Sequence, residues 1–177
     1  QEALKGPSLL EKKVDYDKEI AVIVARNAEG ETTAYPVVEL VFHPTQNMLD
    51  YLASPASISD AVAEKAKSIA LDVINKLDMT GILAVEMFVT PNEEVLVNEI
   101  APRPHNSGHQ TIEANITSQY DQHLRAILGL PLGATDITHP CMMINLLGEP
   151  GYSGEAIYEG LDEVLKIRGV YLHLYGK

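Results

Sequence analysis

Two glutamates, Glu86 and Glu99, are spaced so that together they could bind a cation. Each lies in an apolar segment that alternates with the period of a β-strand, Glu86 within residues 82–89 and Glu99 within residues 95–100. If a two-residue hairpin loop at 92–93 joins these strands, the glutamates stand directly opposite each other. Like charges directly opposed in a sheet repel, so the pair requires a counter-charge. A hard divalent cation such as Mg²⁺, bound by carboxylates and water, is the simplest one.

The register of this hairpin is an assumption, because a loop one residue longer or shorter would move Glu99 to the other face. In the assumed register Glu99 shares a face with Val95 and Val97. Spacing alone leaves a second interpretation open, a two-faced hairpin whose glutamates are solvated. The next segment, 103–108 (RPHNSG), favours a site, since it supplies a cation, an imidazole, an amide and a hydroxyl.

A small mixed fold must position these residues. Apolar residues recur with the strand and helix periods, and Pro36 indicates an edge or a bulge in the strand that contains it. The fold class is α+β, a mostly antiparallel sheet with a long helix packed against one face, followed by a smaller unit. Strands are predicted at 19–28, 32–43, 82–89, 95–100, 142–147 and 170–175, and helices at 59–77, 118–128 and 161–166.

Composition excludes several classes of protein. The net charge of −12 argues against a nucleic-acid-binding surface. No apolar run approaches the roughly 20 residues needed to span a bilayer, which argues against a membrane partner. The single cysteine, Cys141, excludes an intramolecular disulfide framework and a cysteine-rich metal site, and fits a reducing cytoplasm. The common phosphate loops and hydrolase motifs, GxxxxGK[ST], GxGxxG, HExxH and GxSxG, are absent.

The run NEIAPRPHNSGHQTIEANITSQYDQHLRAILGLPLG, residues 98–133, resembles the C-terminal half of an ATP-grasp domain. More narrowly, it is similar to the 5-(carboxyamino)imidazole ribonucleotide synthase family. The resemblance extends from about Leu9 to the last predicted strand. It implies a C-terminal ATP-grasp lobe over residues 1–137 and the start of a small, β-rich C-terminal domain over 138–177.

The resemblance also implies a reaction. ATP, bicarbonate and aminoimidazole ribonucleotide would give 5-(carboxyamino)imidazole ribonucleotide, ADP and phosphate in purine biosynthesis, by way of carboxyphosphate. The implied cofactors are ATP and Mg²⁺, with Mn²⁺ as an alternative metal. The family commonly forms homodimers.

Five positions match the metal and bicarbonate residues of that family. Glu86 and Glu99 match its Mg²⁺ ligands. Arg103, His105 and Asn106 match positions that hold bicarbonate or carboxyphosphate and the substrate amine. Arginine suits a bidentate grip on a planar oxyanion. His105 could hydrogen-bond to bicarbonate or shuttle a proton, and the sequence leaves both open.

Five further positions match the nucleotide site. Asn98 matches a position that touches the phosphates or the metal. Glu11, Lys12 and Val14 match the inter-lobe hinge, where backbone groups read the adenine edge. Glu19 matches the carboxylate that accepts the ribose hydroxyls.

Two alternative functions remain open from the sequence. The formate-dependent glycinamide ribonucleotide transformylase shares the R-P-H run but continues with Asp and Thr, where this chain has Asn106 and Ser107. The second alternative is a non-catalytic half-domain. The family's N-terminal domain, its first ATP-grasp lobe and its basic RKMGH-like segment have no counterpart in these 177 residues. The isolated chain is therefore expected to show no turnover and, at best, weak nucleotide binding.

Overall fold

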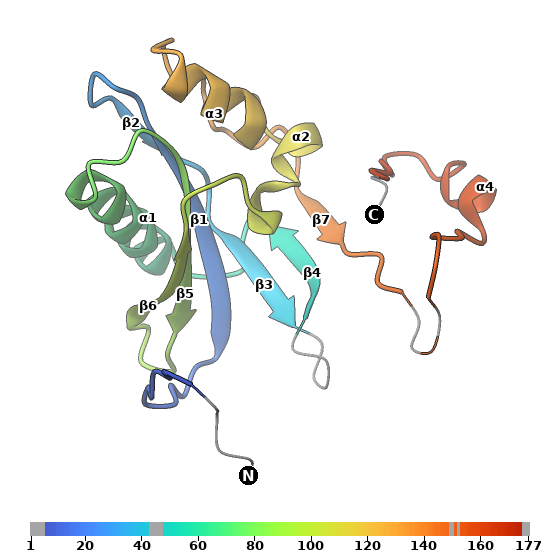
Figure 1. The fold of residues 1–177 in the computed structure, drawn as a ribbon, viewed down its shortest axis with the longest axis horizontal. Coiled ribbons are helices and arrows are strands. Elements are labelled where there is room, and N and C mark those ends of the chain that lie inside the picture. The colour runs from blue at the N-terminus through green and yellow to red at the C-terminus, as the bar shows by residue number, and fades with distance from the viewer. Residues whose placement is uncertain (1–5, 43–47, 149–150, 152, 175–177) are drawn as a thin grey trace. The chain divides into compact units, whose positions relative to one another are not determined.

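The structure is a computed structural model that describes residues 6–42, 48–148, 151 and 153–174. The chain divides into two compact units, Gln1–Met143 and Ile144–Lys177. The first unit contains the predicted antiparallel sheet with its packed helices, so the α+β fold class is confirmed (Figure 1). Among the described helices, none is long and apolar enough to cross a membrane.

Seven strands form the sheet within the described residues. Its spatial order is β6-β5-β1-β3-β4-β7, and β2 pairs separately with β1. The central strand β1 runs antiparallel to β2, β3 and β5. The strands are β1 (Lys18–Arg26), β2 (Thr32–Ala34), β3 (Val38–Phe42), β4 (Leu49–Ser54), β5 (Gly81–Val89), β6 (Val95–Ala101) and β7 (Cys141–Ile144).

The strand predicted over residues 32–43 is interrupted, as Pro36 had indicated. β2 pairs with one end of β1 through Val24 and Ala34, whereas β3 pairs with the other end through Ala21 and Val38. Proline has no N–H to donate to a sheet ladder, so pairing stops around it and resumes beyond it.

The long helix α1 (Asp60–Lys76) covers one face of the sheet (Figure 1). Ser59 caps its N-terminus by accepting a hydrogen bond from the backbone N–H of Val62. The inward stripe of the helix packs against alternate residues of β1 and β5, because those strands send every second side chain toward it. The shared core includes Val62, Ala66, Ala70, Ile74, Val22, Val24, Leu83, Val85 and Met87.

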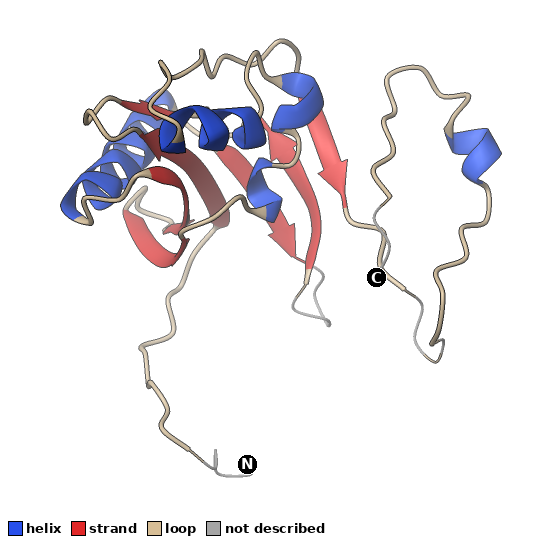
Figure 2. Cartoon of the chain, turned by 45° about the horizontal axis from the view of Figure 1, so that its top comes forward, coloured by secondary structure: helices blue, strands red, loops and turns tan. Residues whose placement is uncertain are grey.

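The opposite face carries two apolar clusters, one of which contains Ala21, Val38, Leu40 and Leu52. The other lies beneath α2 (Thr111–Ala114) and α3 (Gln119–Ile127), which Figure 2 shows on the other side of the sheet from α1. There the Tyr35 hydroxyl donates a hydrogen bond of 3.0 Å to the carbonyl of Thr117. Its buried residues are Ile23, Ala25, Tyr35, Ile82, Ala84 and Ala101.

The second unit has less regular structure than the sequence predicted. It contains the short helix α4 (Leu161–Val164), within the predicted range. The strand predicted at 170–175 does not form over residues 170–174, and residue 175 lies outside the described residues. The described part of this unit offers no neighbouring strand with which 170–174 could pair. β7 ends before the predicted 147, and the domain division predicted after residue 137 remains a prediction.

Candidate functional site

Glu86 and Glu99 do stand opposite each other on β5 and β6, as predicted, although the loop between the strands is longer than expected. Val89 pairs with Val95, and the backbone N–H of Thr90 donates to the carbonyl of Glu94 at 3.0 Å. The turn therefore spans residues 91–93 in place of the predicted two residues. By itself, this longer turn would have moved Glu99 to the other face of the sheet.

A β-bulge at Asn98 restores the opposed pair. The pairing register shifts by one residue between Val97 and Glu99, and Asn98 is the extra residue. Glu99 consequently lies on the face opposite to Val95 and Val97, which corrects the prediction that the three share a face. The longer turn and the bulge each shift the register by one residue, and the two shifts cancel at Glu86. Asn98 itself is exposed.

A third carboxylate, Glu19 on β1, lies on the same face. Ala21 of β1 is paired with Glu86, and Glu19 is paired with Phe88, so these side chains share one side of the sheet. Burial, together with the negative charges of Glu99 and Glu19, raises the pKa of Glu86 to about 7. We call Glu19, Glu86 and Glu99 the acidic cluster.

The acidic cluster fits a hard divalent cation. Its donors are carboxylate oxygens, the ligands that Mg²⁺ prefers. Burial, Glu99 and Glu19 each favour the protonated form of Glu86 over the negatively charged form. A bound cation would reverse that effect by favouring the ionised form of Glu86.

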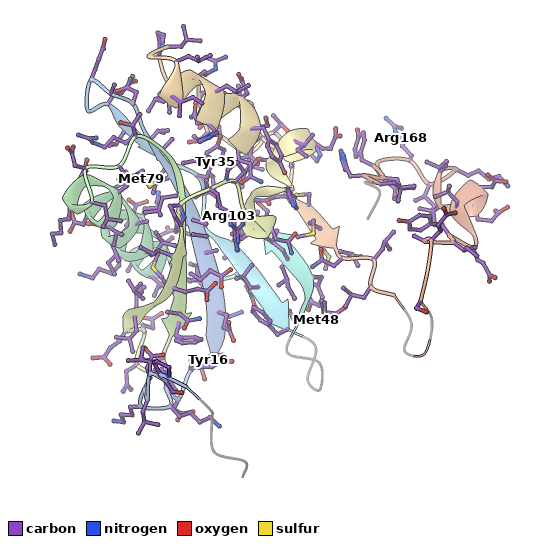
Figure 3. All side chains as sticks on the ribbon, viewed as in Figure 1. Tyr16, Tyr35, Met48, Met79, Arg103 and Arg168 are labelled. Atoms are coloured by element: carbon purple, nitrogen blue, oxygen red, sulfur yellow. The ribbon has the colours of Figure 1, made fainter. Side chains whose placement is uncertain are left out.

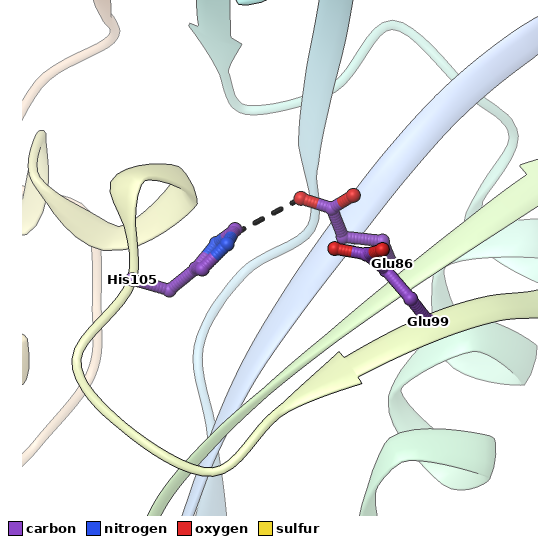
Figure 4. A group of neighbouring side chains, drawn as sticks. All are labelled: Glu86, Glu99 and His105. Carbon is purple, nitrogen blue, oxygen red and sulfur yellow. Dashed lines mark ion pairs between the residues drawn. The ribbon is translucent and has the colours of Figure 1, made fainter. Parts of the chain in front are cut away.

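His105 completes the site (Figure 4). A ring nitrogen of His105 and one carboxylate oxygen each of Glu86 and Glu99 lie within 4.8 Å of one another. The ring nitrogen Nδ1 is 3.7 Å from Oε1 of Glu86, which is an ion pair only when the imidazole is protonated. Burial, followed by the positive charge of Arg103, lowers the pKa of His105. The neutral imidazole is thus favoured in this position.

Ser107 determines which nitrogen of His105 carries the proton. The backbone N–H of Ser107 donates to Nδ1 of His105 at 3.3 Å, and the Ser107 Oγ lies 2.9 Å from the same nitrogen. Since a backbone N–H is always a donor, Nδ1 acts as the acceptor and the neutral ring carries its proton on Nε2. His105 therefore has an N–H to offer a ligand, and the oxygen donors of the glutamates suit Mg²⁺ better than Nδ1 does.

Arg103 and Asn106 flank His105 in the same loop. The Arg103 side chain is exposed, and its Nη1 donates to the carbonyl of Pro104 at 3.1 Å (Figure 3). Its guanidinium is close enough to lower the pKa of His105. Asn106 begins the short 3₁₀ helix η1 (Asn106–Gly108), which His105 caps. The structure thus places His105 beside Glu86, with Arg103 and Asn106 close to it in the same loop.

The predicted nucleotide residues are placed less uniformly. Glu19 lies in the acidic cluster and accepts a hydrogen bond of 2.5 Å from the hydroxyl of Tyr16. The Tyr16 ring stacks on Phe88 with ring centroids 4.4 Å apart, a contact that the sequence analysis missed. Glu11, Lys12 and Val14 lie in the irregular segment before β1, where the structure describes no contact between them and the acidic cluster.

Gln119, a residue that was not predicted from the sequence, forms hydrogen bonds with the backbone of His105. It is wholly buried, as is Gln122 one turn further along α3. A signal was present in the sequence. Two glutamines at i and i+3 share the inner face of the helix with Ala126, and buried amides in that position must find hydrogen-bond partners.

In the metal-free protein, Glu86 is expected to make stability fall as the pH rises. Its pKa is about 7 when folded, against an ordinary value of 4.5, so the folded state holds this proton more tightly. The free energy of unfolding should therefore decrease between these two pH values, by up to about 3 kcal/mol for this group. Glu86→Gln should remove that decrease. Urea denaturation with a chelator present, at about pH 5 and about pH 8, measures it.

Glu94→Gln is the control for this experiment, because Glu94 is an exposed glutamate of the same hairpin. It should keep the wild-type dependence on pH. An unchanged dependence in Glu86→Gln would contradict the raised pKa.

Two protein-family models match the chain. The model described as "ATP-grasp domain" matches residues 1–120. The model described as "Phosphoribosylaminoimidazole carboxylase C-terminal domain" matches residues 141–177. The first match contains the acidic cluster and the whole of the 103–108 loop.

Several proteins are similar over most of the chain. It is 43% identical over 172 residues to N5-carboxyaminoimidazole ribonucleotide synthase of Bacillus subtilis, covering 97% of this chain and 43% of that protein. The solved N5-carboxyaminoimidazole ribonucleotide synthetase of Thermotoga maritima is 50% identical with a TM-score of 0.88, covering 99% of this chain and 46% of that one. N5-carboxyaminoimidazole synthase of Aspergillus clavatus, solved with ADP and 5-aminoimidazole ribonucleotide, is 39% identical with a TM-score of 0.74, covering 78% and 37%. The chain spans less than half the length of each of these relatives.

Proposed function

Because the chain belongs to the ATP-grasp family, we propose that it forms the metal- and bicarbonate-binding part of a carboxylating ligase. The ligase joins the carboxyl group of bicarbonate to the amine of aminoimidazole ribonucleotide. It gives 5-(carboxyamino)imidazole ribonucleotide, ADP and phosphate in purine biosynthesis. The observation that carries the proposal is the convergence of Glu86, Glu99 and His105, whose ligand atoms lie within 4.8 Å of one another. The names of the Bacillus subtilis and Thermotoga maritima relatives support the choice of substrate.

In this proposal Glu86 and Glu99 hold Mg²⁺, or Mn²⁺ as the alternative, and Asn98 adds an amide oxygen beside them. The bound metal would neutralise charge on the phosphates of ATP. The raised pKa of Glu86 supports the assignment, because burial and the charges of Glu99 and Glu19 leave a negative site that lacks a counter-charge. Glu19 accepts the ribose hydroxyls, a role that its place on the same face supports.

Arg103, His105 and Asn106 bind bicarbonate and the carboxyphosphate that forms from it. The guanidinium of Arg103 offers two parallel N–H donors to an oxyanion. Ser107 engages Nδ1 of His105, which leaves Nε2–H as a donor. This tautomer favours hydrogen bonding to the bicarbonate oxygens over proton shuttling. The adenine edge is read by the backbone of Glu11, Lys12 and Val14, as the resemblance predicts.

The complete ligase should form ADP only when bicarbonate is present, and aminoimidazole ribonucleotide should stimulate the rate. A coupled assay of ADP release measures both dependences. Replacing bicarbonate by formate, and the ribonucleotide by glycinamide ribonucleotide, separates this function from the formate-using alternative. Asn106 and Ser107 predict no activity with formate. ADP formation that is supported by formate and is indifferent to bicarbonate would contradict the proposal.

We place the ligase in the cytoplasm, where ATP and bicarbonate are available and where a lone thiol such as Cys141 stays reduced. Burial raises the pKa of Cys141, which keeps it an unreactive thiol. The resemblance further predicts a homodimer, which analytical ultracentrifugation of the complete ligase would test.

A further inference from the structure

The buried amide of Gln119 on α3 grips the backbone of His105 from both sides. The Gln119 Oε1 accepts a hydrogen bond of 2.9 Å from the N–H of His105, and its Nε2 donates one of 2.8 Å to the carbonyl of the same residue. Gln119 is 0% exposed, so neither bond competes with water. The two bonds also fix the orientation of the amide, because only its oxygen can face an N–H and only its nitrogen can face a carbonyl.

The surroundings of Gln119 hold the amide in one place. The backbone N–H of Gln119 donates to Oγ1 of Thr111 at 2.8 Å, and that hydroxyl donates to the carbonyl of Gly108. Gly108 leaves room for the amide, since a Cβ there would lie 2.4 Å from Oε1 of Gln119. The Nε2 of Gln119 also lies 3.3 Å from Nδ1 of His109. Every polar atom of this side chain therefore has a neighbour with which it can bond.

We propose that Gln119 is a positioning residue that holds His105 over the Glu86–Glu99 pair so that its imidazole can meet the bound oxyanion. Gln119 fixes the main chain of His105, and Ser107 fixes the ring through Nδ1. With both fixed, the Nε2–H donor has one direction. Placing a reacting group correctly matters greatly, because a misplacement of about 1 Å can cost a rate factor of about 100. This inference rests on the proposed function for the role of His105.

The same helix supplies a matched control for a purely structural role. Gln122 is also 0% exposed and grips the backbone of one residue in the same way. Its Nε2 donates to the carbonyl of Gly133 at 2.8 Å, and its Oε1 accepts from the N–H of Gly133 at 2.7 Å. Gly133 lies in the segment after α3, whereas His105 lies in the site loop. Gln119→Met and Gln122→Met thus remove equivalent bonds from different segments.

The experiment uses the complete ligase with Gln119→Met, Gln119→Glu and Gln122→Met. Initial rates are measured against bicarbonate and, separately, against ATP, and thermal unfolding is recorded for each variant. Gln119→Met should lower kcat/KM for bicarbonate by at least about 10-fold and leave KM for ATP within about two-fold of wild type. Gln122→Met should lower the Tm about as much as Gln119→Met does, but it should leave kcat/KM for bicarbonate and KM for ATP within about two-fold of wild type.

Gln119→Glu adds a readout that a structural role would not produce. The ionised carboxylate accepts from the N–H of His105 but repels its carbonyl, whereas the protonated acid can make both bonds. The activity of this variant relative to wild type should therefore rise as the pH falls. A constant ratio across the pH range would overturn the proposal.

Amide hydrogen exchange in residues 103–108 provides a readout that needs no reaction. Exchange should be at least about 10-fold faster in Gln119→Met than in wild type, and unchanged in Gln122→Met. If ADP formation by the wild-type enzyme did not depend on bicarbonate, the proposed function would be wrong. The exchange result would still decide whether Gln119 positions His105. Bicarbonate kinetics and exchange that stay at wild-type values in Gln119→Met would overturn the inference, even if its Tm falls.

Discussion

Glu99→Gln in the complete ligase should lower the rate of bicarbonate-dependent ADP formation by at least about 100-fold. Glutamine has the size of glutamate, so the pairing of β5 with β6 should survive and the charge alone is lost. Glu99 stands directly opposite Glu86, and their carboxylates form the cation site proposed above. ADP release at saturating Mg²⁺-ATP measures the loss. A rate near wild type would show that Glu99 is not a metal ligand.

Glu86→Gln should lower the rate of bicarbonate-dependent ADP formation by a similar factor. It should, however, raise the stability of the metal-free protein. Burial and repulsion by Glu99 and Glu19 make the ionised Glu86 costly, and a neutral glutamine avoids that cost, so the metal-free protein should become more stable above about pH 7. A variant that loses activity and gains stability cannot be explained by misfolding. The exposed Glu94→Gln serves as the control and should retain activity within about two-fold of wild type.

Arg103→Met should reduce kcat/KM for bicarbonate by at least about 100-fold, because an oxyanion loses its bidentate partner. The Arg103 guanidinium is exposed beside His105 and donates only one described side-chain bond, to the carbonyl of Pro104. Folding should therefore change little. Arg103→Lys should recover part of the loss, since it restores the charge without the planar fork. Initial rates at varied bicarbonate concentration give kcat/KM for each of the two variants, Arg103→Met and Arg103→Lys.

Arg125→Met is the matched control for the arginine series. Arg125 lies on α3, where its Nε donates to Asp121 at 3.1 Å in an exposed i,i+4 ion pair. Exposed ion pairs of this kind contribute little to stability, so kcat/KM for bicarbonate should stay within about two-fold of wild type. Equal losses in Arg103→Met and Arg125→Met would indicate a general effect of charge and would contradict a binding role for Arg103.

Several regular elements of the first unit could be predicted because each of them repeats a local pattern. The stripe from Val62 to Ile74 predicted α1, and its members pack against the sheet. Pro36 predicted the break between β2 and β3, because a missing N–H interrupts pairing wherever it falls. The strand predicted at 170–175 does not form over the described residues 170–174, because a local pattern is not enough without a pairing partner. Its apolar residues gave the right period, but the described part of its unit provides no strand with which to pair.

The hairpin shows how a correct pairing can follow from an incorrect local model. The sequence predicted Glu86 opposite Glu99 from a two-residue loop at 92–93. The structure reaches the same pair through a longer turn and a bulge at Asn98. Loop length and bulges each change the register by one residue, and sequence periodicity cannot see their sum. One consequence of the assumed two-residue loop was therefore wrong: Glu99 does not share a face with Val95 and Val97.

The amino-acid sequence alone was enough to identify the family and to predict the residues of the candidate site, since Glu86, Glu99 and the 103–108 loop are close along the chain. Their mutual geometry required the folded molecule. Tyr16 meets Phe88, Glu19 joins the acidic cluster, and Gln119 reaches back to His105. Such contacts join segments that are distant in sequence, and they arise from strand order, helix placement and burial. A local pattern carries none of that information, so the partners of Glu86 and His105 became visible only once the sheet and α3 were in place.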